Sequence, residues 1–225
     1  MNLDVVIWVL VIGFLAYFII SRVFKKLNLN NLIAALQVTN GLRLLNLKHL
    51  LGIIFFGILP FVLIPDLRFL VFNIEILRLH LLIIFLFLVF FCVYIACLGV
   101  RNESEILEAD SVCFYHFREA GYYFVVRFVF LLCYEFFFRG IMLFFFLEFS
   151  SLWLAICCVT VFYVLIHFFD SKKEMLGAIP FGIVLCLLAF YTDSIWYPFI
   201  LHLTLSAVYE ISIFYQLTLK NKSES

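Results

Sequence analysis

Several ionisable residues interrupt long apolar stretches of this 225-residue sequence, where a charge needs a reason to be present. Glu135 and Arg139 are four residues apart, a spacing that places both side chains on one face of a helix. His167 follows in the next apolar stretch, and His202 precedes Ser206 by one helical turn in the last. A carboxylate and two imidazoles can activate water as a general base, stabilise an oxyanion or bind a metal ion.

Each of these residues also has a simpler interpretation. Glu135 and Arg139 can neutralise one another as an ion pair, although two apolar residues would do the packing at lower cost. A single histidine near a membrane interface is usually structural, and His202 can hydrogen-bond to Ser206 along its own helix. Arg127 is expected to extend its side chain to the interface, and we give it no role. Because the carboxylate, the arginine and the two histidines occupy three different stretches, their combination predicts a shared polar site.

Membrane-spanning helices are the elements expected to position these residues. Apolar residues make up 67% of the chain and charged residues 13%, against about 45–50% and about 25% in average globular proteins. A water-soluble fold of this size could not bury so much apolar surface. Fifteen basic residues balance fifteen acidic ones, which gives no positive field for nucleic acid. The seven cysteines form no Cys-x-x-Cys pair and are expected to act as small apolar residues.

Seven apolar stretches approach the roughly 20 residues that a spanning helix needs, and an eighth span is left open. They cover residues 5–20, 50–64, 81–100, 122–147, 152–169, 175–191 and 195–217, and the first three have no ionisable residue between their ends. Eleven Lys and Arg residues fall in the loops and tail on one side and two in those on the other. This bias predicts an N-terminus outside and a C-terminus in the cytoplasm.

The segment from about residue 27 to residue 50 has a different pattern. Leu29, Leu32, Ile33 and Leu36 follow the spacing of an amphipathic helix. We expect a helix that lies in the inner membrane surface, held partly by nearby basic residues. A helix that docks on a partner is the alternative.

The residues in the apolar stretches resemble the CAAX prenyl protease 2 family, also called the CPBP or Abi family, whose members are polytopic intramembrane endopeptidases. The family pattern is Glu-Glu-x-x-x-Arg-Gly in one helix, Phe-x-x-x-His in the next and His-x-x-x-Asn in a later one. The chain has Tyr134-Glu135-x-x-x-Arg139-Gly140, then Tyr163-x-x-x-His167, then His202-x-x-x-Ser206. The lead-in from Ser194 to His202 is also similar, and the resemblance covers about residues 120 to 212.

The resemblance implies a role for each matching position. In the family, the first Glu and the first His activate the attacking water, while the last His and the Asn hold the oxyanion. Carried over residue by residue, Tyr134 occupies the catalytic Glu position, His167 orients the water, His202 and Ser206 form the oxyanion pair, and Glu135 and Arg139 are the supporting ion pair.

Two departures from the family pattern affect the chemistry. Tyr134 is no base near neutral pH, because an unperturbed phenol has a pKa of about 10. Losing a general base removes about 10²–10⁴ of rate. Either Glu135 serves as the base, the protein is a pseudoprotease that binds peptide or lipid, or Tyr134 supports a different chemistry. Glu135 lies about 100° around the helix from position 134, so it would have to rotate locally. Ser206 in place of Asn still offers a hydroxyl donor.

The expected spans place the site residues at different depths. Glu135 is near the membrane centre, His167 is near the inner face, and His202 is nearer the outer face. Upright helices would keep these side chains apart, so strong tilts or broken helices would have to bring them together.

We therefore expect an all-α polytopic membrane protein, with N-terminal spans over residues 1–118, a CAAX-protease-like domain over residues 119–217 and a polar tail over residues 218–225. The resemblance implies a glutamic-type endopeptidase that cleaves peptide or protein substrates, lipidated or not, at the lipid bilayer. The alternatives are an inactive member that acts as a binding or bacteriocin-immunity protein, and a small transporter or scaffold. We expect a bacterial plasma membrane location, no cofactor, no metal and no nucleic acid.

Overall fold

The structure is a computed structural model that describes residues 2–74, 76–104, 115 and 117–220, and every regular element in these residues is a helix. Seven helical stretches are long and apolar enough to cross a membrane, which confirms the predicted fold class. They are formed by α1 (Leu3–Lys26); α3 (Gly41–Ile53), η1 (Ile54–Ile58) and α4 (Leu59–Leu63); α6 (Leu79–Ser104); α7 (Phe117–Glu135), η4 (Phe136–Met142) and α8 (Leu143–Leu147); α9 (Leu152–Ile166) and η5 (His167–Phe169); α10 (Lys172–Thr192); and α11 (Trp196–Tyr215) and η6 (Gln216–Lys220).

The segment predicted as one interfacial helix over residues 27–50 is divided in the structure. A short helix, α2 (Leu32–Leu36), is capped by the Asn31 side chain, and the second span then begins at Gly41. Leu29, Leu32 and Leu36 are buried against the ends of α7 and α11, so the apolar face covers the chain itself. The single helix was therefore a wrong prediction, because Asn40 adopts a left-handed conformation (φ 60°) that ends one helical path and starts another.

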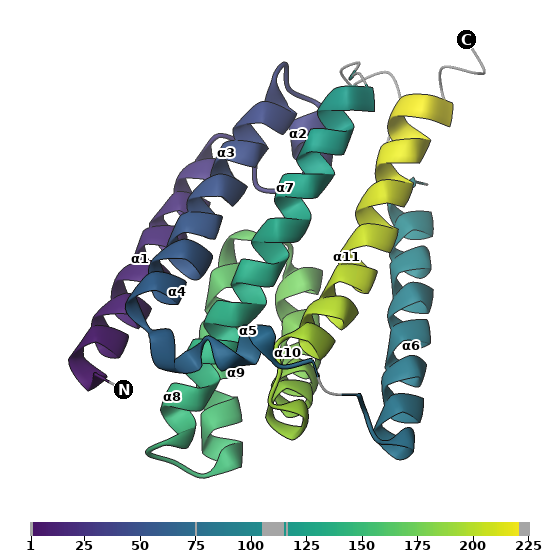
Figure 1. The fold of residues 1–225 in the computed structure, drawn as a ribbon. Helices are drawn as coiled ribbons and strands as arrows, with labels where there is room; N and C mark the ends of the chain where they lie inside the picture. The colour runs from purple at the N-terminus through teal and green to yellow at the C-terminus, as the bar shows by residue number, and fades with distance from the viewer. Residues whose placement is uncertain (1, 75, 105–114, 116, 221–225) are drawn as a thin grey trace.

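The spans form one bundle with α7 at its centre (Figure 1). α3 packs along α7, α6 packs along α11, and α9 pairs with α10. α1 begins at one end of the bundle and α11 ends at the opposite end, as an odd number of spans requires (Figure 1). Two short helices, η2 (Pro65–Leu67) and α5 (Phe69–Phe72), connect α4 towards α6 at the end where α1 begins.

The largest core cluster joins the N-terminal spans to the C-terminal ones. Phe56 of η1 lies against the rings of Tyr134, Phe137 and Phe138, at centroid distances of 5.6, 4.4 and 5.7 Å. All four side chains are buried. The two π-helical segments η1 and η4 are therefore in contact. Elements of the first half of the chain pack against the motif helix, by which we mean the continuous stretch of α7, η4 and α8 that carries Tyr134, Glu135 and Arg139.

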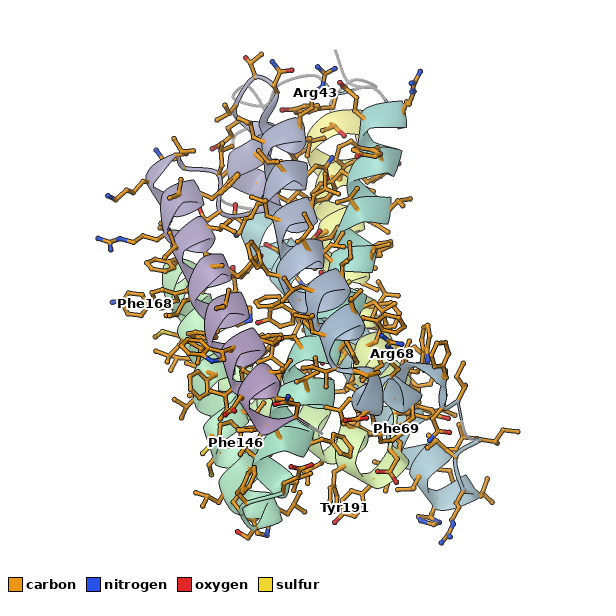
Figure 2. All side chains as sticks on the ribbon, turned by 60° about the vertical axis from the view of Figure 1, so that its left-hand side comes forward. Arg43, Arg68, Phe69, Phe146, Phe168 and Tyr191 are labelled. Carbon is orange, nitrogen blue, oxygen red and sulfur yellow. The ribbon has the colours of Figure 1, made fainter. Side chains whose placement is uncertain are left out.

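Large apolar side chains also cover the outside of the bundle (Figure 2). Trp8, Phe87, Phe90 and Trp153 are each more than 60% exposed. A surface of this kind is expected where the surrounding solvent is lipid. The protein is a multi-pass integral membrane protein.

The turn between α9 and α10 lies near the middle height of the bundle (Figure 1). Figure 2 agrees, because Phe168 lies between the levels of Arg43 at one end and Tyr191 at the other. Phe169 packs on Phe18 of α1, with ring centroids 4.8 Å apart. This position brings the end of α9 towards the central part of α7.

Candidate functional site

Glu135 joins two spans at the point where α7 changes into the π-helical segment η4. Its Oε1 is 2.6 Å from Nδ1 of His202 on α11, and its Oε2 is 3.3 Å from Nε of Arg139. Glu135 and Arg139 are fully buried, and His202 is 8% exposed. The guanidinium of Arg139 also lies 4.0 Å from the centre of the Tyr163 ring. π-helical segments occur frequently at functional sites, and this one begins immediately after the carboxylate.

The contact between Glu135 and His202 determines which imidazole nitrogen is available. An ionised carboxylate only accepts hydrogen bonds, so Nδ1–H of His202 donates to Glu135. Nε2 of His202 then carries no proton in the neutral ring, and the rings of Tyr134 and Phe181 pack on this histidine. A carboxylate that holds one nitrogen of a histidine fixes the tautomer and orientation of the ring.

Tyr134 lies near both histidines that the sequence motifs predicted. Its ring centroid is 5.9 Å from that of His202 and 6.4 Å from that of His167, with both pairs in edge geometry. The side chain is 3% exposed. Within the described part of the chain, the buried Tyr134 hydroxyl has no hydrogen-bond partner. A buried hydroxyl without a partner is costly, so the position favours a group that arrives with substrate or water.

His167 is the first residue of η5, at the mid-height turn. Its Nδ1 is 2.9 Å from Oδ2 of Asp170, and its ring packs on Tyr163 at a centroid distance of 4.9 Å. Burial raises the pKa of Asp170, but the hydrogen bond and positive charge from His167, with Lys48 and Arg127 nearby, lower it below its ordinary value. Sequence reasoning gave Asp170 no role, and its place three residues after His167 was the available signal for this contact.

A second polar cluster lies beside the first and includes Ser206. Arg127 Nε donates to Glu210 Oε1 at 2.9 Å, and Arg127 Nη2 donates to Ser206 Oγ at 3.1 Å. Ser206 donates to Glu210 Oε1 at 3.0 Å, and the Tyr123 hydroxyl donates to Glu210 Oε2 at 2.8 Å. Arg127 therefore ties α7 to α11, and the prediction that it extends to the interface was wrong because a buried carboxylate faces it. Ser206 makes its hydrogen bonds within this cluster, so it does not depend on His202 for a hydrogen-bond partner.

Sequence reasoning missed Glu210 and two ionisable residues of the second span. Glu210 follows Ser206 by four residues, and this helical spacing was the available signal. Lys48 and His49 are buried inside the second span, which begins earlier than predicted. Lys48 Nζ donates to the carbonyl of Asn30, and the His49 ring lies 5.8 Å from that of Tyr123. The predicted start of the second span at residue 50 was therefore wrong, and the span that begins at Gly41 does carry ionisable residues.

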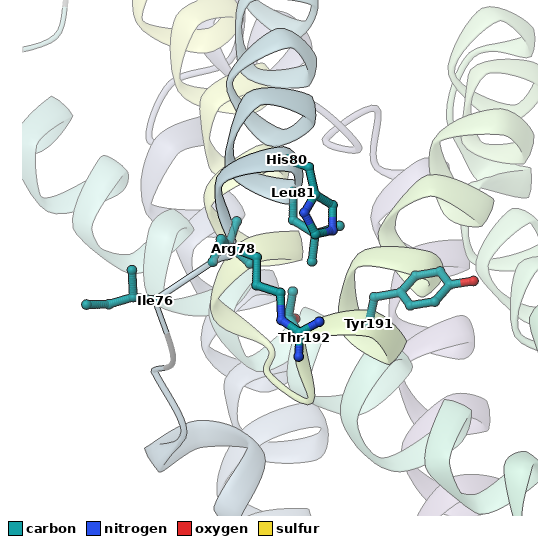
Figure 3. A pocket seen from close by; sticks show the side chains of 7 residues that line it. Ile76, Arg78, His80, Leu81, Tyr191 and Thr192 are labelled. Atoms are coloured by element: carbon teal, nitrogen blue, oxygen red, sulfur yellow. The ribbon is translucent and has the colours of Figure 1, made fainter.

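Other places in the fold do not contribute to this arrangement. Among the residues that the structure describes, no group of three His, Cys, Asp or Glu side chains could hold a metal ion. A cavity of about 490 Å³ opens between the start of α6 and the end of α10 (Figure 3). Its lining includes Arg78, His80 and Tyr191 and none of the predicted site residues.

Comparison with known proteins gives one family. Residues 116–208 match the family model described as type II CAAX prenyl endopeptidase Rce1-like. The comparison with curated proteins and the comparison with solved structures gave no match. The matched range contains all six predicted site residues: Tyr134, Glu135, Arg139, His167, His202 and Ser206.

Proposed function

Residues 116–208 belong to the CAAX protease family, in its Rce1-like type II CAAX prenyl endopeptidase branch, and from this membership we propose that the protein is a membrane-embedded endopeptidase. The observation that carries the proposal is the buried contact between Glu135 and His202, made across two spans beside Tyr134. Three short motifs that are far apart in the sequence supply polar groups to one neighbourhood. A structural ion pair between Glu135 and Arg139 alone would not require either histidine.

Peptide hydrolysis needs a base for the attacking water, and His167 is the candidate. Its Nδ1 is engaged by Asp170, while Nε2 is buried and, in the described residues, has no hydrogen-bond partner. Nε2 takes a proton from water as the oxygen attacks the peptide carbonyl. The same nitrogen then gives that proton to the leaving amine as the carbon–nitrogen bond breaks. This assignment replaces the Glu that the family carries at position 134.

Tyr134 and His202 are the candidates for stabilising the oxyanion. A neutral phenol is a hydrogen-bond donor, and the Tyr134 hydroxyl is buried without a partner in the described part of the structure. A preorganised donor at a developing oxyanion is worth about 10²–10³ in kcat. His202 is held by Glu135, and its ring centroid is 5.9 Å from that of Tyr134. Because Nδ1–H of His202 donates to Glu135, Nε2 donates only when the ring carries both protons.

An inactive binding protein is the second candidate, and one observation favours it. Glu135 already contacts both Arg139 and His202, so no carboxylate of the motif helix is free to act as a base. In that case the buried cluster would keep the fold and present a peptide-binding surface. The two candidates differ in whether peptide bonds are broken.

Cleavage by purified protein in lipid vesicles separates the two candidates. The substrates are a fluorogenic CAAX-type peptide with and without a prenyl group, and the variants are His167→Ala, His202→Ala and Tyr134→Glu. If the protein is an endopeptidase, the wild type cleaves at least one peptide, and each histidine variant loses about 10²-fold or more. If only Tyr134→Glu cleaves, the protein is a pseudoprotease with an intact pocket. No cleavage by wild type or by Tyr134→Glu would contradict the endopeptidase proposal.

A further inference from the structure

We infer that Asp170 is a positioning residue for His167. The Asp170 carboxylate accepts the hydrogen bond from Nδ1–H of His167, which leaves Nε2 as the atom that meets the reacting water. The inference rests on the proposed function, because it assigns a second residue to the same histidine. Asp170 lies outside the three family motifs, in the turn between α9 and α10.

The contact has the geometry of a charge-assisted hydrogen bond. Asp170 Oδ2 is 2.9 Å from Nδ1 of His167, within the range for an N–H donor and a carboxylate. The side chains are only 18% and 23% exposed, so solvent competes weakly for either partner. Because a carboxylate cannot donate, the proton lies on Nδ1 of His167 and the lone pair on Nε2.

The surroundings of Asp170 favour its ionised form. Lys48 on α3 and Arg127 on α7 act on it as positive charges, and Glu174 on α10 is the neighbouring negative charge. Tyr17 on α1 also interacts with it electrostatically. The positive charges therefore outweigh the negative one at this carboxylate, which is 18% exposed.

His167 and His202 share one pattern. Each ring gives Nδ1 to a carboxylate, Asp170 or Glu135, and each ring lies at the edge of Tyr134. Carboxylates that hold the far nitrogen of a working imidazole fix its tautomer, and removing such a partner typically costs about 10–100-fold in activity. If the contact between His167 and Asp170 only stabilised the turn, a buried Nε2 without a hydrogen-bond partner in the described residues would add nothing to stability.

The test reads the tautomer of His167 directly in the full chain reconstituted in lipid nanodiscs. Histidine nitrogens are labelled with ¹⁵N, and the His167 signals are those missing from His167→Gln. In the wild type we expect a protonated Nδ1 and an unprotonated Nε2. In Asp170→Ala the proton should move to Nε2, and the exposed Asp4→Ala should leave the spectrum unchanged. Asp170→Leu, which has a similar shape and no hydrogen-bond acceptor, is the second variant if Asp170→Ala does not fold.

Kinetics on the same variants provide the second readout. Asp170→Ala should lower kcat about 10–100-fold while KM stays within about twofold, and Asp170→Glu should recover part of the loss. An Nε2-protonated wild type, or a tautomer that does not change in Asp170→Ala and Asp170→Leu, would overturn the inference. If the wild type cleaves no peptide, the proposed function fails, while the tautomer measurement still decides the role of Asp170.

Discussion

Glu135 is the residue on which the buried cluster depends. It is the negative charge that faces Arg139, and both side chains are completely buried. Replacing a buried ion pair by apolar residues can be neutral, but removing one partner leaves an uncompensated charge. The contact with His202 adds a hydrogen bond between two spans to this effect. A substitution of Glu135 is therefore expected to affect both the candidate site and the stability of the helix bundle.

Glu135→Gln should lower the free energy of unfolding by about 3–5 kcal/mol, because Arg139 would remain buried without a counter-charge. The matched control is Glu119→Gln, which breaks the Arg43–Glu119 pair with side chains 72% and 31% exposed. A pair this exposed contributes about 0–1 kcal/mol. Denaturant unfolding in detergent micelles measures both variants. Equal losses in the two would contradict the account of Glu135.

At the residue scale, sequence motifs predicted which side chains meet but not all of their partners. Glu135, Arg139 and His202 were found because charged groups in apolar stretches must avoid lipid. Asp170 and Glu210 were not, because a contact across spans depends on depth and rotation that no local spacing encodes. The roles given to His167, Tyr134 and Ser206 remain predictions, and the hydrogen bonds of Ser206 favour a clamp between spans over an oxyanion donor.

The sequence predicted the membrane-spanning helices more completely than the π-helical segments and the turn that interrupt them. Seven helices follow directly from the length and composition of the apolar stretches. The π-helical segments η1 and η4, and the turn of α9 and α10 at middle height, were not evident in the pattern. They explain how His167 can lie beside Tyr134 although the sequence placed it near the inner face. Both features result from packing between spans.

Close helix contact depends on small residues, and Gly52 of α3 is one such residue. A Cβ at this position would overlap the ring of Phe130 and lie 2.8 Å from the ring of Tyr17. Gly52→Ala should therefore destabilise the fold by about 1–3 kcal/mol. Gly121→Ala and Gly177→Ala are the controls, since an added Cβ there meets nothing within 4 Å. The thermal midpoint in detergent distinguishes the three variants, and a Gly52→Ala midpoint as high as those of the controls would refute the contact.

The orientation of the whole molecule in the membrane is a prediction from loop charge. With the spans expected from the sequence, eleven Lys and Arg residues lie on one side and two on the other, which predicts the N-terminus outside and the C-terminus in the cytoplasm. The structure places Lys48, one of the eleven, inside the second span. A green fluorescent protein fused after Ser225 should fluoresce in a bacterial host, and alkaline phosphatase at the same position should be inactive. The reverse pair of results would show that the bundle is inverted.

At the scale of the whole molecule, the N-terminal half is part of the site's frame. Phe56 packs on Phe137, and the positive charge of Lys48 on α3 contributes to the lowered pKa of Asp170. The sequence carried no motif in this half, so its contribution could be found only from packing. The domain boundary near residue 118 remains a prediction, because one aromatic core extends across it.

The most direct test of the central claim is the cleavage rate of Tyr134→Phe beside the wild type in lipid vesicles. The change removes only a hydroxyl that is buried and, in the described residues, unpartnered, so folding should be preserved. If the hydroxyl donates to the oxyanion, kcat should fall about 10²–10³-fold with KM little changed. A Tyr134→Phe protein that cleaves as fast as the wild type would contradict the claim that Tyr134 serves the reaction in place of a catalytic Glu.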